Sequence, residues 1–515
     1  MAFCHGVNTT SVYWQVNWQR SKVKAAIQNI TLCSVPSNVG CGANDGAYYP
    51  IGLLSLGTLV RQTRPDVAVS IVDLHHHPDF QPVRDIVGIS SSSTLNYRNV
   101  LKLARKAKDA GALVVLGGPH VTQLADQILR NRMELVDYVV RGHGEHAFVA
   151  LLDALRSGSD LLQVPNLSWR DTRGHVIHNP EASTVWKYDD FLPLDMSLLS
   201  HGIEPYWRTF QQRIDQSVDA AFVVFTHFGC GYRETMKASS NSRHRLSSWC
   251  SYCSLNDALF ARRGEAIVNE TLGLLRTCNV PRGAKVLLKC YGDNVGSQRN
   301  MLQELATAID RNNEWRQYQI GWTFYCQSSR LSPELAELLA RIGTQNVYIG
   351  FDSADDEIQK LNGLGTSLKS HWRAIELCKA SGLKIQAGFV LGCAGETERS
   401  LDNTLRFAEQ LSACGVLERI NSAILFIIPG SPAYWALCEH EPWIRNLDEF
   451  STTELRRLWV KHFCPNLGSG TDDALERLRF AANRLDELSP GPHASMGFVS
   501  NRLAANLTPA EPVYA

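Results

Sequence analysis

The sequence lacks the marks of a secreted, membrane-spanning or repetitive protein. Its 515 residues contain no long apolar span, no signal-peptide pattern, no internal repeat and no low-complexity tract. Neither sign of charge is in excess, because Lys plus Arg and Asp plus Glu both number 51. We therefore expect no nucleic-acid partner and no membrane partner. The 14 cysteines do not follow a disulfide spacing, so we expect a reducing, cytoplasmic environment.

A chain of this length exceeds one ordinary core, which predicts two or three domains. In the first third, short apolar runs alternate with helix-length segments. The runs are Ile30–Val35, Val67–Val72, Ile86–Ile89, Leu113–Leu116 and Tyr138–Val140. This alternation predicts an α/β domain with a doubly wound, Rossmann-like parallel sheet.

Ligands of such sheets bind at the carboxyl ends of the strands. Those ends are rich in glycine, hydroxyl and other hydrogen-bonding residues, which let a large ligand approach the backbone. The candidate positions are Ser90, Ser92, Thr94, Gly117, Gly118, Pro119, Gly142 and Glu145.

A second alternation predicts six more strands and a partial (β/α)6 barrel of the TIM type, with its site at the strands' carboxyl ends. The expected strands are Ala221–Phe225, Val286–Cys290, Ile320–Cys326, Asn346–Phe351, Ile385–Leu391 and Ala423–Ile428. Amphipathic spacing predicts helices over Thr453–Phe463 and Asp472–Leu488. The expected organisation is an N-terminal extension (1–28), the first domain (29–160), a connector with a short hairpin (161–215), the barrel (216–435) and a helical C-terminal region with a frayed tail (436–515).

Three cysteines, Cys230, Cys250 and Cys253, follow the first barrel strand. If residues Glu234–Trp249 are left out, they form a C-x3-C-x2-C pattern. From the residues alone, they are three unrelated thiols, a structural zinc site lacking its fourth ligand, or ligands of another metal group. Stretching the first spacing from three to nineteen residues costs only about 1.6 kcal/mol of loop entropy, which is small beside typical metal-binding energies of about 10 kcal/mol or more.

The C-x3-C-x2-C junction resembles the cluster loop of the radical S-adenosylmethionine (SAM) enzymes. The resemblance implies that the three thiolates hold a 4Fe-4S cluster whose fourth iron binds SAM. It also assigns SAM-binding positions beside the cluster and at the barrel strand ends. These are Tyr252, Gly292, Asp293, Asn294, Gln327, Arg330, Asp352, Ser353, Gly392, Glu396, Ile428 and Pro429.

Two of these matches depart from the family's motifs. Asp352 stands where the family has Glu, so its side chain is one methylene shorter. Cys393 and Ala394 replace a Leu-Pro pair, and Cys393 is either a further thiol of the site or a small buried hydrophobe. Asp293 and Arg330 also have ordinary alternatives, a surface turn and a solvated charge.

Residues 30 to 150 resemble the cobalamin-binding domain that precedes many radical SAM domains, on Tyr49-Pro50-Ile51-Gly52-Leu53 and on the strand ends named above. The D-x-H-x-x-G motif that supplies a histidine to cobalt is absent after the first strand. His75, His76 and His77 follow the second strand without the glycine, and we interpret them as an exposed turn. We therefore expect cobalamin held without a protein histidine.

These resemblances imply an enzyme that cleaves SAM reductively to a 5'-deoxyadenosyl radical and, with cobalamin, methylates an unactivated carbon of a small molecule. They imply an electron donor such as flavodoxin or ferredoxin. No residue is assigned to substrate chemistry. The alternatives are a radical rearrangement or cyclisation without methyl transfer, and an inactive corrinoid-binding relative whose cluster loop is interrupted.

The interrupting segment, Glu234–Trp249, is polar and basic and has no apolar period. It is either a true surface loop or sequence absent from the mature protein, such as a retained intron. We favour the second and expect a chain without it to bind the cluster at least as well.

Overall fold

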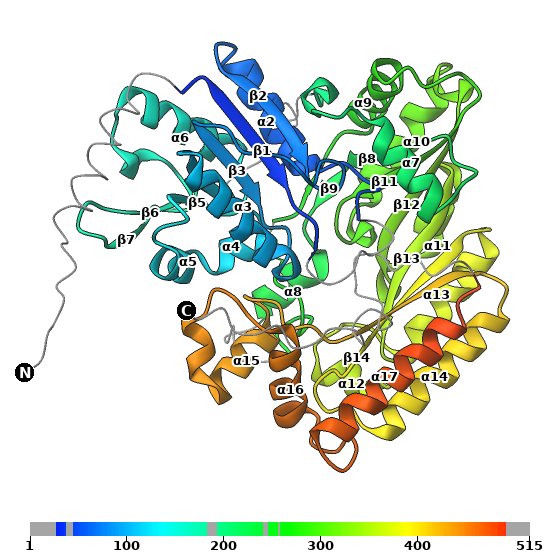
Figure 1. Ribbon diagram of the computed structural model, residues 1–515. Helices are drawn as coiled ribbons and strands as arrows, with labels where there is room; N and C mark the ends of the chain where they lie inside the picture. Colours follow the sequence, from blue (N-terminus) through cyan, green and yellow to red (C-terminus); the bar gives the residue numbers. More distant parts are fainter. Residues whose placement is uncertain (1–26, 38–44, 183–192, 240–245, 256–257, 491–515) are drawn as a thin grey trace, which may run out of the picture.

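The computed structural model describes residues 27–37, 45–182, 193–239, 246–255 and 258–490 (Figure 1). Nearly all of the predicted N-terminal extension, the centre of the segment Glu234–Trp249 and the last residues of the predicted tail lie outside these ranges.

The first domain is a seven-stranded sheet in the order β2-β1-β3-β4-β5-β6-β7, and its first five strands are parallel. Its strands are β1 (Asn29–Ser34), β2 (Ala68–Asp73), β3 (Ile86–Ser90), β4 (Leu113–Gly117), β5 (Tyr138–Val140), β6 (Leu167–Arg170) and β7 (Val176–His178). Its helices are α2 (Ile51–Thr63), α3 (Tyr97–Asp109), α4 (Pro119–Gln123), α5 (Ala125–Asn131) and α6 (Glu145–Ser157). The predicted doubly wound sheet is confirmed, since β1 lies between β2 and β3 and its four central side chains are buried.

The hairpin that the sequence placed in the connector is part of this sheet. β6 pairs antiparallel with β5, with Tyr138 opposite Trp169, and β7 pairs antiparallel with β6. Gly174 makes the turn at φ +84°, where glycine has no steric penalty. The edge of a parallel sheet offers unpaired backbone groups, and the hairpin satisfies them.

The second domain is a parallel six-stranded sheet in the order β15-β14-β13-β12-β11-β8. Its strands are β8 (Ala220–Phe225), β11 (Lys285–Tyr291), β12 (Gln319–Gln327), β13 (Thr344–Asp352), β14 (Lys384–Leu391) and β15 (Leu417–Ile424), with a separate short pair, β9 (His227–Phe228) and β10 (Phe260–Ala261). Its helices are α8 (Gly231–Ser239), α9 (Gly264–Thr277), α10 (Arg299–Arg311), α11 (Pro333–Arg341), α12 (Asp356–Leu361), α13 (Leu368–Ala380) and α14 (Glu398–Ala413). The predicted strand–helix alternation and partial barrel are confirmed.

One strand lies elsewhere than predicted. The sequence placed the sixth strand at residues 423–428, whereas β15 spans Leu417–Ile424 and its last pairing is Leu391 with Ile424. Of the apolar residues that follow, Leu425 and Ile427 are buried, and the Leu425 amide still donates to the Leu391 carbonyl at 2.7 Å. The actual strand was missed because it contains polar residues, one of which, Ser422, is buried and donates to Asp486 at 2.7 Å.

Both open edges of the barrel are covered by other parts of the chain. On β8, the Tyr49 hydroxyl donates to the Val223 carbonyl at 2.6 Å and accepts from its amide at 3.1 Å. On β15, the Ile420 amide donates to Ser489 Oγ at 3.0 Å, and α17 (Thr471–Glu487) packs along the strand. The barrel is therefore closed on one side by the first domain and on the other by the C-terminal region.

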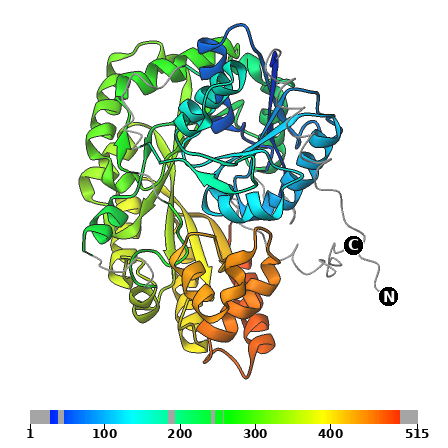
Figure 2. The same ribbon diagram turned by 90° about the vertical axis from the view of Figure 1, so that its left-hand side faces the viewer.

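The remaining helices are α7 (Glu204–Arg213) in the connector and α15 (Pro432–His440), α16 (Thr452–Phe463) and α17 in the C-terminal region. Figure 1 shows α15 and α16, in orange, below the first domain and α17, in red, beside the barrel, and Figure 2 shows the same helices from another side. Within the described residues, no helix is both long enough and apolar enough to cross a bilayer.

Candidate cluster and cofactor site

The three cysteines of the predicted cluster loop come together beyond the carboxyl end of β8. Burial, followed by charge repulsion from Cys253, Asp352 and Cys230, raises the pKa of the Cys250 thiol well above its ordinary value. Burial also raises the pKa of Cys253 to about 11, and Cys230 adds to that rise. Each thiolate is thus within electrostatic reach of the others. Three thiolates can ionise together only beside a strong cation, so this donor set fits a metal cluster.

Hydrogen-bond donors face two of the sulfurs. The Leu255 amide donates to Cys253 Sγ at 3.4 Å, and Asn294 Nδ2 lies 3.9 Å from Cys230 Sγ. Within the described residues, no three His, Cys, Asp or Glu side chains are close enough to hold a single metal ion.

The turn carrying Cys250 and Cys253 is held by the loop that follows α12. The Ser251 amide donates to the Asn362 carbonyl at 2.9 Å, and Tyr232 OH donates to the Gly363 carbonyl at 2.8 Å. Gly363 has φ +58°, and a Cβ there would meet the Trp249 carbonyl at 2.7 Å. Sequence reasoning missed this support, although the sequence Asn-Gly-Leu-Gly of this loop, between two helices, is typical of a tight turn.

Several predicted SAM positions gather around the cysteine turn. Asn294 Nδ2 donates to Gln327 Oε1 at 3.3 Å, and Gln327 Nε2 donates to the Leu364 carbonyl at 2.6 Å. Asp293 Oδ2 accepts from the Gly229 amide at 2.7 Å, next to Cys230. The ends of β11 and β12 are thus fastened to the loop that carries the first thiol.

Tyr252 connects the cysteine turn to the end of β13. Its hydroxyl donates to the Asp352 carboxylate, and burial raises the pKa of that carboxyl to about 6. Asp352 has φ +60°, a left-handed conformation that costs energy for any residue with a Cβ, and β13 bulges beside it. The shorter acid in place of the family's Glu therefore holds Tyr252.

Other predicted SAM positions have partners elsewhere in the barrel domain. Ser353 is buried and its hydroxyl lies 3.4 Å from Thr404 Oγ1, while Glu396 accepts from the Gly392 amide at 3.1 Å and from Ser400 Oγ. Arg330 lies at the end of β12 beside Gly296. Burial raises the pKa of Tyr232 to about 12, although the positive charge of Arg330 acts in the opposite direction.

Two further positions have backbone roles. A Cβ on Gly292 would meet the buried His227 ring at 2.6 Å, so this glycine makes room for a side chain that sequence reasoning missed. The loop containing Ile428 and Pro429 leads into α15, where the Ala433 amide donates to the Ser251 carbonyl at 2.8 Å. All the SAM contacts remain predictions.

Cys393 is fully buried at the end of β14, and its thiol donates to the Val390 carbonyl at 3.5 Å. Burial, followed by the charges of Glu396 and Asp352, raises its pKa well above the ordinary value. These surroundings favour the small-hydrophobe reading over a further ligand.

The predicted corrinoid positions lie at the ends of β3, β4 and β5. Gly118 has φ +105°, and a Cβ there would lie 2.6 Å from the Ser91 carbonyl oxygen, so the backbones meet closely. Thr94 Oγ1 lies 2.9 Å from His120 Nδ1, and the Gly142 amide donates to Thr122 Oγ1 at 3.0 Å. Small residues at adjacent strand ends fit a flat, bulky ligand.

The remaining corrinoid positions lie in the same domain. Ser90 ends β3, Gly117 ends β4 and Pro119 begins α4. Ser92 Oγ accepts from Asn96 at 3.0 Å, and Glu145, at the start of α6, accepts from Ser55 Oγ at 3.0 Å.

The three consecutive histidines, His75 to His77, follow β2, which is an edge strand of the first sheet. His75 Nδ1 bonds to Asp73 Oδ1 at 2.8 Å, and His76 Nε2 bonds to the Gly46 carbonyl at 2.8 Å. Tyr206 of α7 donates to the other Asp73 oxygen at 3.1 Å. The predicted exposed turn is wrong for His75 and His76, which belong to a half-buried network joining the first domain to the connector.

The cofactor edges of the two domains face one another. His143, in the loop after β5, lies with its ring 4.7 Å from that of Phe228, two residues before Cys230. Phe228 also packs against Phe225 at 3.9 Å. The predicted corrinoid loop therefore touches the cysteine loop.

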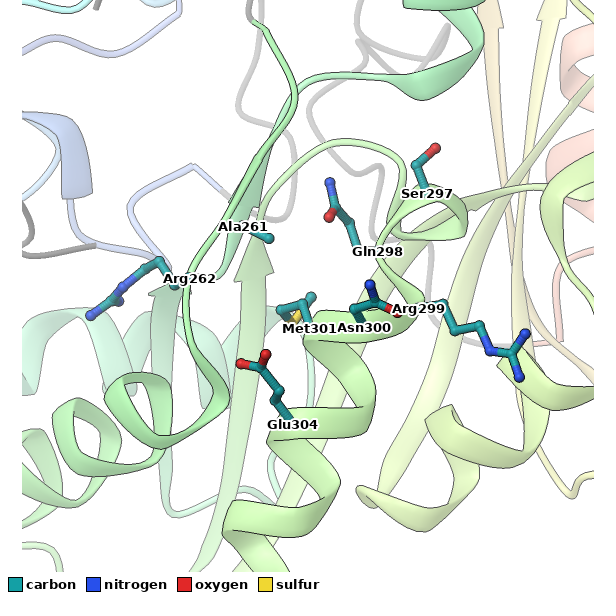
Figure 3. A pocket seen from close by; sticks show the side chains of 8 residues that line it. All are labelled: Ala261, Arg262, Ser297, Gln298, Arg299, Asn300, Met301 and Glu304. Carbon is teal, nitrogen blue, oxygen red and sulfur yellow. The ribbon is translucent and has the colours of Figure 1, made fainter. Parts of the chain in front are cut away.

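A cavity of about 310 Å³ lies on another side of the cysteine loop, between β10 and the start of α10 (Figure 3). Its lining includes Ser297, whose side chain lies against Gly231. The Arg262 and Arg299 side chains lead away from the other lining residues, and Glu304 also lines the cavity. None of the predicted SAM positions lines it.

Two family models match the chain, the B12 binding domain over residues 39–152 and the radical SAM superfamily over residues 244–408. The second match begins after Cys230, inside the segment that interrupts the cluster loop.

Known proteins resemble the chain over most of its length. An uncharacterised methyltransferase of Pyrococcus horikoshii is 26% identical, covering 70% of this chain and 73% of that protein. A bacteriochlorophyllide d C-12(1)-methyltransferase of Chlorobaculum tepidum is 22% identical, covering 68% and 65%.

In fold, the chain resembles the radical SAM methyltransferase TsrM of Kitasatospora setae, with a TM-score of 0.62, 18% identity and coverage of 80% and 78%. It also resembles the cobalamin-dependent radical enzyme OxsB, with a TM-score of 0.60, 15% identity and coverage of 85% and 66%. With both domains matched in this order and their strand-end loops in contact, the chain combines a B12 binding domain with a radical SAM domain.

Proposed function

We propose that the protein transfers a methyl group to an unactivated carbon of a small molecule. The contact between His143 and Phe228 carries this proposal, because it brings the corrinoid strand ends beside the cysteine loop. A 4Fe-4S cluster with an open iron supplies the electron that cleaves SAM, and cobalamin supplies a cobalt able to carry a methyl group. A methyl transfer needs both cofactors within reach of one substrate, and the contact between the two loops supports such an arrangement.

The side chains around the cysteine turn act by binding and orientation. The Asn294–Gln327 pair fixes the ends of β11 and β12, and Arg330 supplies a cation suited to the carboxylate of SAM. Tyr252, held by Asp352, presents a ring beside the thiols, where the SAM adenine would stack.

Relatives support a small-molecule substrate. The solved structures include TsrM with tryptophan bound, and the curated relatives include a tryptophan 2-C-methyltransferase of Streptomyces laurentii, 27% identical over 35% of this chain and 32% of that protein. We also propose an electron-donor protein, such as flavodoxin or ferredoxin, and a reducing cytoplasmic location, which suits the free cysteines of the described residues.

The test is anaerobic reconstitution of the full chain with iron, sulfide and hydroxocobalamin, followed by SAM and a chemical reductant. We expect both 5'-deoxyadenosine and S-adenosylhomocysteine, the second only when cobalamin is present. Formation of 5'-deoxyadenosine alone, in equal amount without cobalamin, would contradict methyl transfer and favour a rearrangement or cyclisation. Absence of both products would favour the inactive relative.

A further inference from the structure

The C-terminal region is fastened to the cobalamin-binding domain as well as to the barrel. Residues 445–450 span the end of η8 (Pro442–Asn446) and most of the loop that leads to α16, and they pack on α5 and the start of α3. We call these residues the docking segment. Gln127 Nε2 donates to the Arg445 carbonyl and Asn131 Nδ2 to the Asn446 carbonyl, both at 2.9 Å. Figure 1 shows α15 and α16 next to this side of the first domain.

Asp448 is the centre of the docking segment. Its side chain is 4% exposed, and its carboxylate accepts from Tyr97 OH at 2.9 Å, Arg132 Nε at 2.7 Å and Asn131 Nδ2 at 3.0 Å. A buried carboxylate is stable only when its lone pairs are satisfied. All three of these donors come from the cobalamin-binding domain, so the docked position satisfies them.

His120 extends this network to a predicted corrinoid position. It is 3% exposed, with Nε2 3.2 Å from the Asp448 carbonyl oxygen and Nδ1 2.9 Å from Thr94 Oγ1. A carbonyl oxygen only accepts, so Nε2 carries a proton. Burial lowers the pKa of His120 to about 4, so the ring is neutral near pH 7 and Nδ1 is an acceptor.

The Thr94 hydroxyl must then donate its proton to Nδ1. Its oxygen is left with lone pairs alone, so Thr94 meets any ligand as a hydrogen-bond acceptor. Thr94 begins η1 (Thr94–Asn96), just beyond the carboxyl end of β3. The rim of a corrinoid carries primary amides, which are hydrogen-bond donors.

Building on the proposed function, we propose that Asp448 and His120 are positioning residues that fix Thr94 as an acceptor for a corrinoid amide. Docking of residues 445–450 and corrinoid binding are then linked, because undocking removes the carbonyl that holds the His120 proton on Nε2. By reciprocity, bound corrinoid strengthens docking by the same factor.

The test is titration of the full chain with hydroxocobalamin. Thr94→Val removes the hydroxyl, and we expect about five- to tenfold weaker binding for the loss of one hydrogen bond. Thr94→Ser keeps the hydroxyl and should stay within about twofold. Asp448→Asn should weaken binding about as much as Thr94→Val. Asp472→Asn, which loses an exposed partner of Arg457, is the matched control and should bind like the wild type.

The double variant Thr94→Val/Asp448→Asn distinguishes a relay from general loosening. If both changes break one chain of hydrogen bonds, the double variant should bind cobalamin about as weakly as whichever single variant has the lower affinity. Losses that multiply would overturn the relay.

Amide hydrogen exchange supplies a second readout that does not depend on activity. Cobalamin should slow exchange of residues 445–450 in the wild type and slow it much less in Thr94→Val, which keeps every Asp448 contact. Unchanged exchange on cobalamin binding would overturn the coupling. If the wild-type protein bound no cobalamin, the proposed function would be overturned as well. If every variant bound cobalamin as tightly as the wild type, only the coupling would be overturned.

Discussion

The Tyr252 hydroxyl donates a hydrogen bond to the carboxylate of Asp352, joining the turn between two cluster cysteines to the end of the barrel strand β13. The acid is held at φ +60° and faces Cys250, whose pKa it helps to raise. Neither residue stabilises the site alone, because each fixes the position of the other.

Replacing Tyr252 by Phe should destabilise the cluster-free protein by about 1–2 kcal/mol, since it removes a donor from a carboxylate shielded from water. Adding Asp352→Asn should restore part of the loss, because Asn is neutral and tolerates left-handed backbone. Thermal unfolding of both variants measures this. Tyr318→Phe, just before β12, is the control, and strictly additive effects of the pair would argue against the bond.

Glu396 should make stability depend on pH. Burial raises its pKa from 4.5 to about 7, and the charge of Asp355 adds to the rise. Between these pH values the folded chain binds a proton that the unfolded chain lacks, so this contribution is lost as pH rises towards 7. Glu396→Gln mimics the neutral acid and removes this part of the pH dependence.

The wild type should therefore lose up to about 3 kcal/mol relative to Glu396→Gln between pH 4.5 and 7.5. Denaturant unfolding across that range measures the difference. The control is Glu398→Gln, whose carboxylate is exposed and pairs with Arg477 at 3.0 Å. Parallel pH curves for wild type and Glu396→Gln would show that the buried acid does not titrate in this range.

Bound cobalamin should keep water or no ligand on its lower face. His75 and His76 bond to Asp73 and the Gly46 carbonyl after the outer strand β2. Alanine at His75, His76 or His77 should leave the cobalt(II) electron paramagnetic resonance spectrum unchanged. A nitrogen splitting in the wild type that vanished in one variant would assign that histidine to cobalt.

The strand–helix alternation and most strand positions follow from the sequence because apolar runs and glycine-rich ends are local signals. The hairpin's place in the first sheet and the true position of β15 do not, since both depend on pairing with distant strands. Asp448 and Tyr97, 351 residues apart, bond only because the C-terminal region folds back. Likewise, the partner of His76, the Gly46 carbonyl, is 30 residues away and appears only in three dimensions.

The segment Glu234–Trp249 is the part of the site that the sequence left open. Its last residue, Trp249, is buried, donates to the Cys253 carbonyl at 3.1 Å and lies 4.7 Å from the Arg233 guanidinium. A chain lacking the segment restores the C-x3-C-x2-C spacing and loses these contacts. We still expect it to bind iron at least as well as the full chain. Iron loss on deletion, together with a transcript that retains the segment, would make Trp249 and its neighbours a true part of the site.

The most direct test of the account is the iron–sulfur content of the reconstituted protein. Cys230, Cys250 and Cys253 should together hold one 4Fe-4S cluster, giving absorbance near 400 nm and 5'-deoxyadenosine on reduction with SAM. Alanine at all three positions should abolish both signals, while Cys414→Ala, at the end of α14, should leave them unchanged. An unaltered spectrum in the triple variant would contradict the assignment of the cluster to these cysteines.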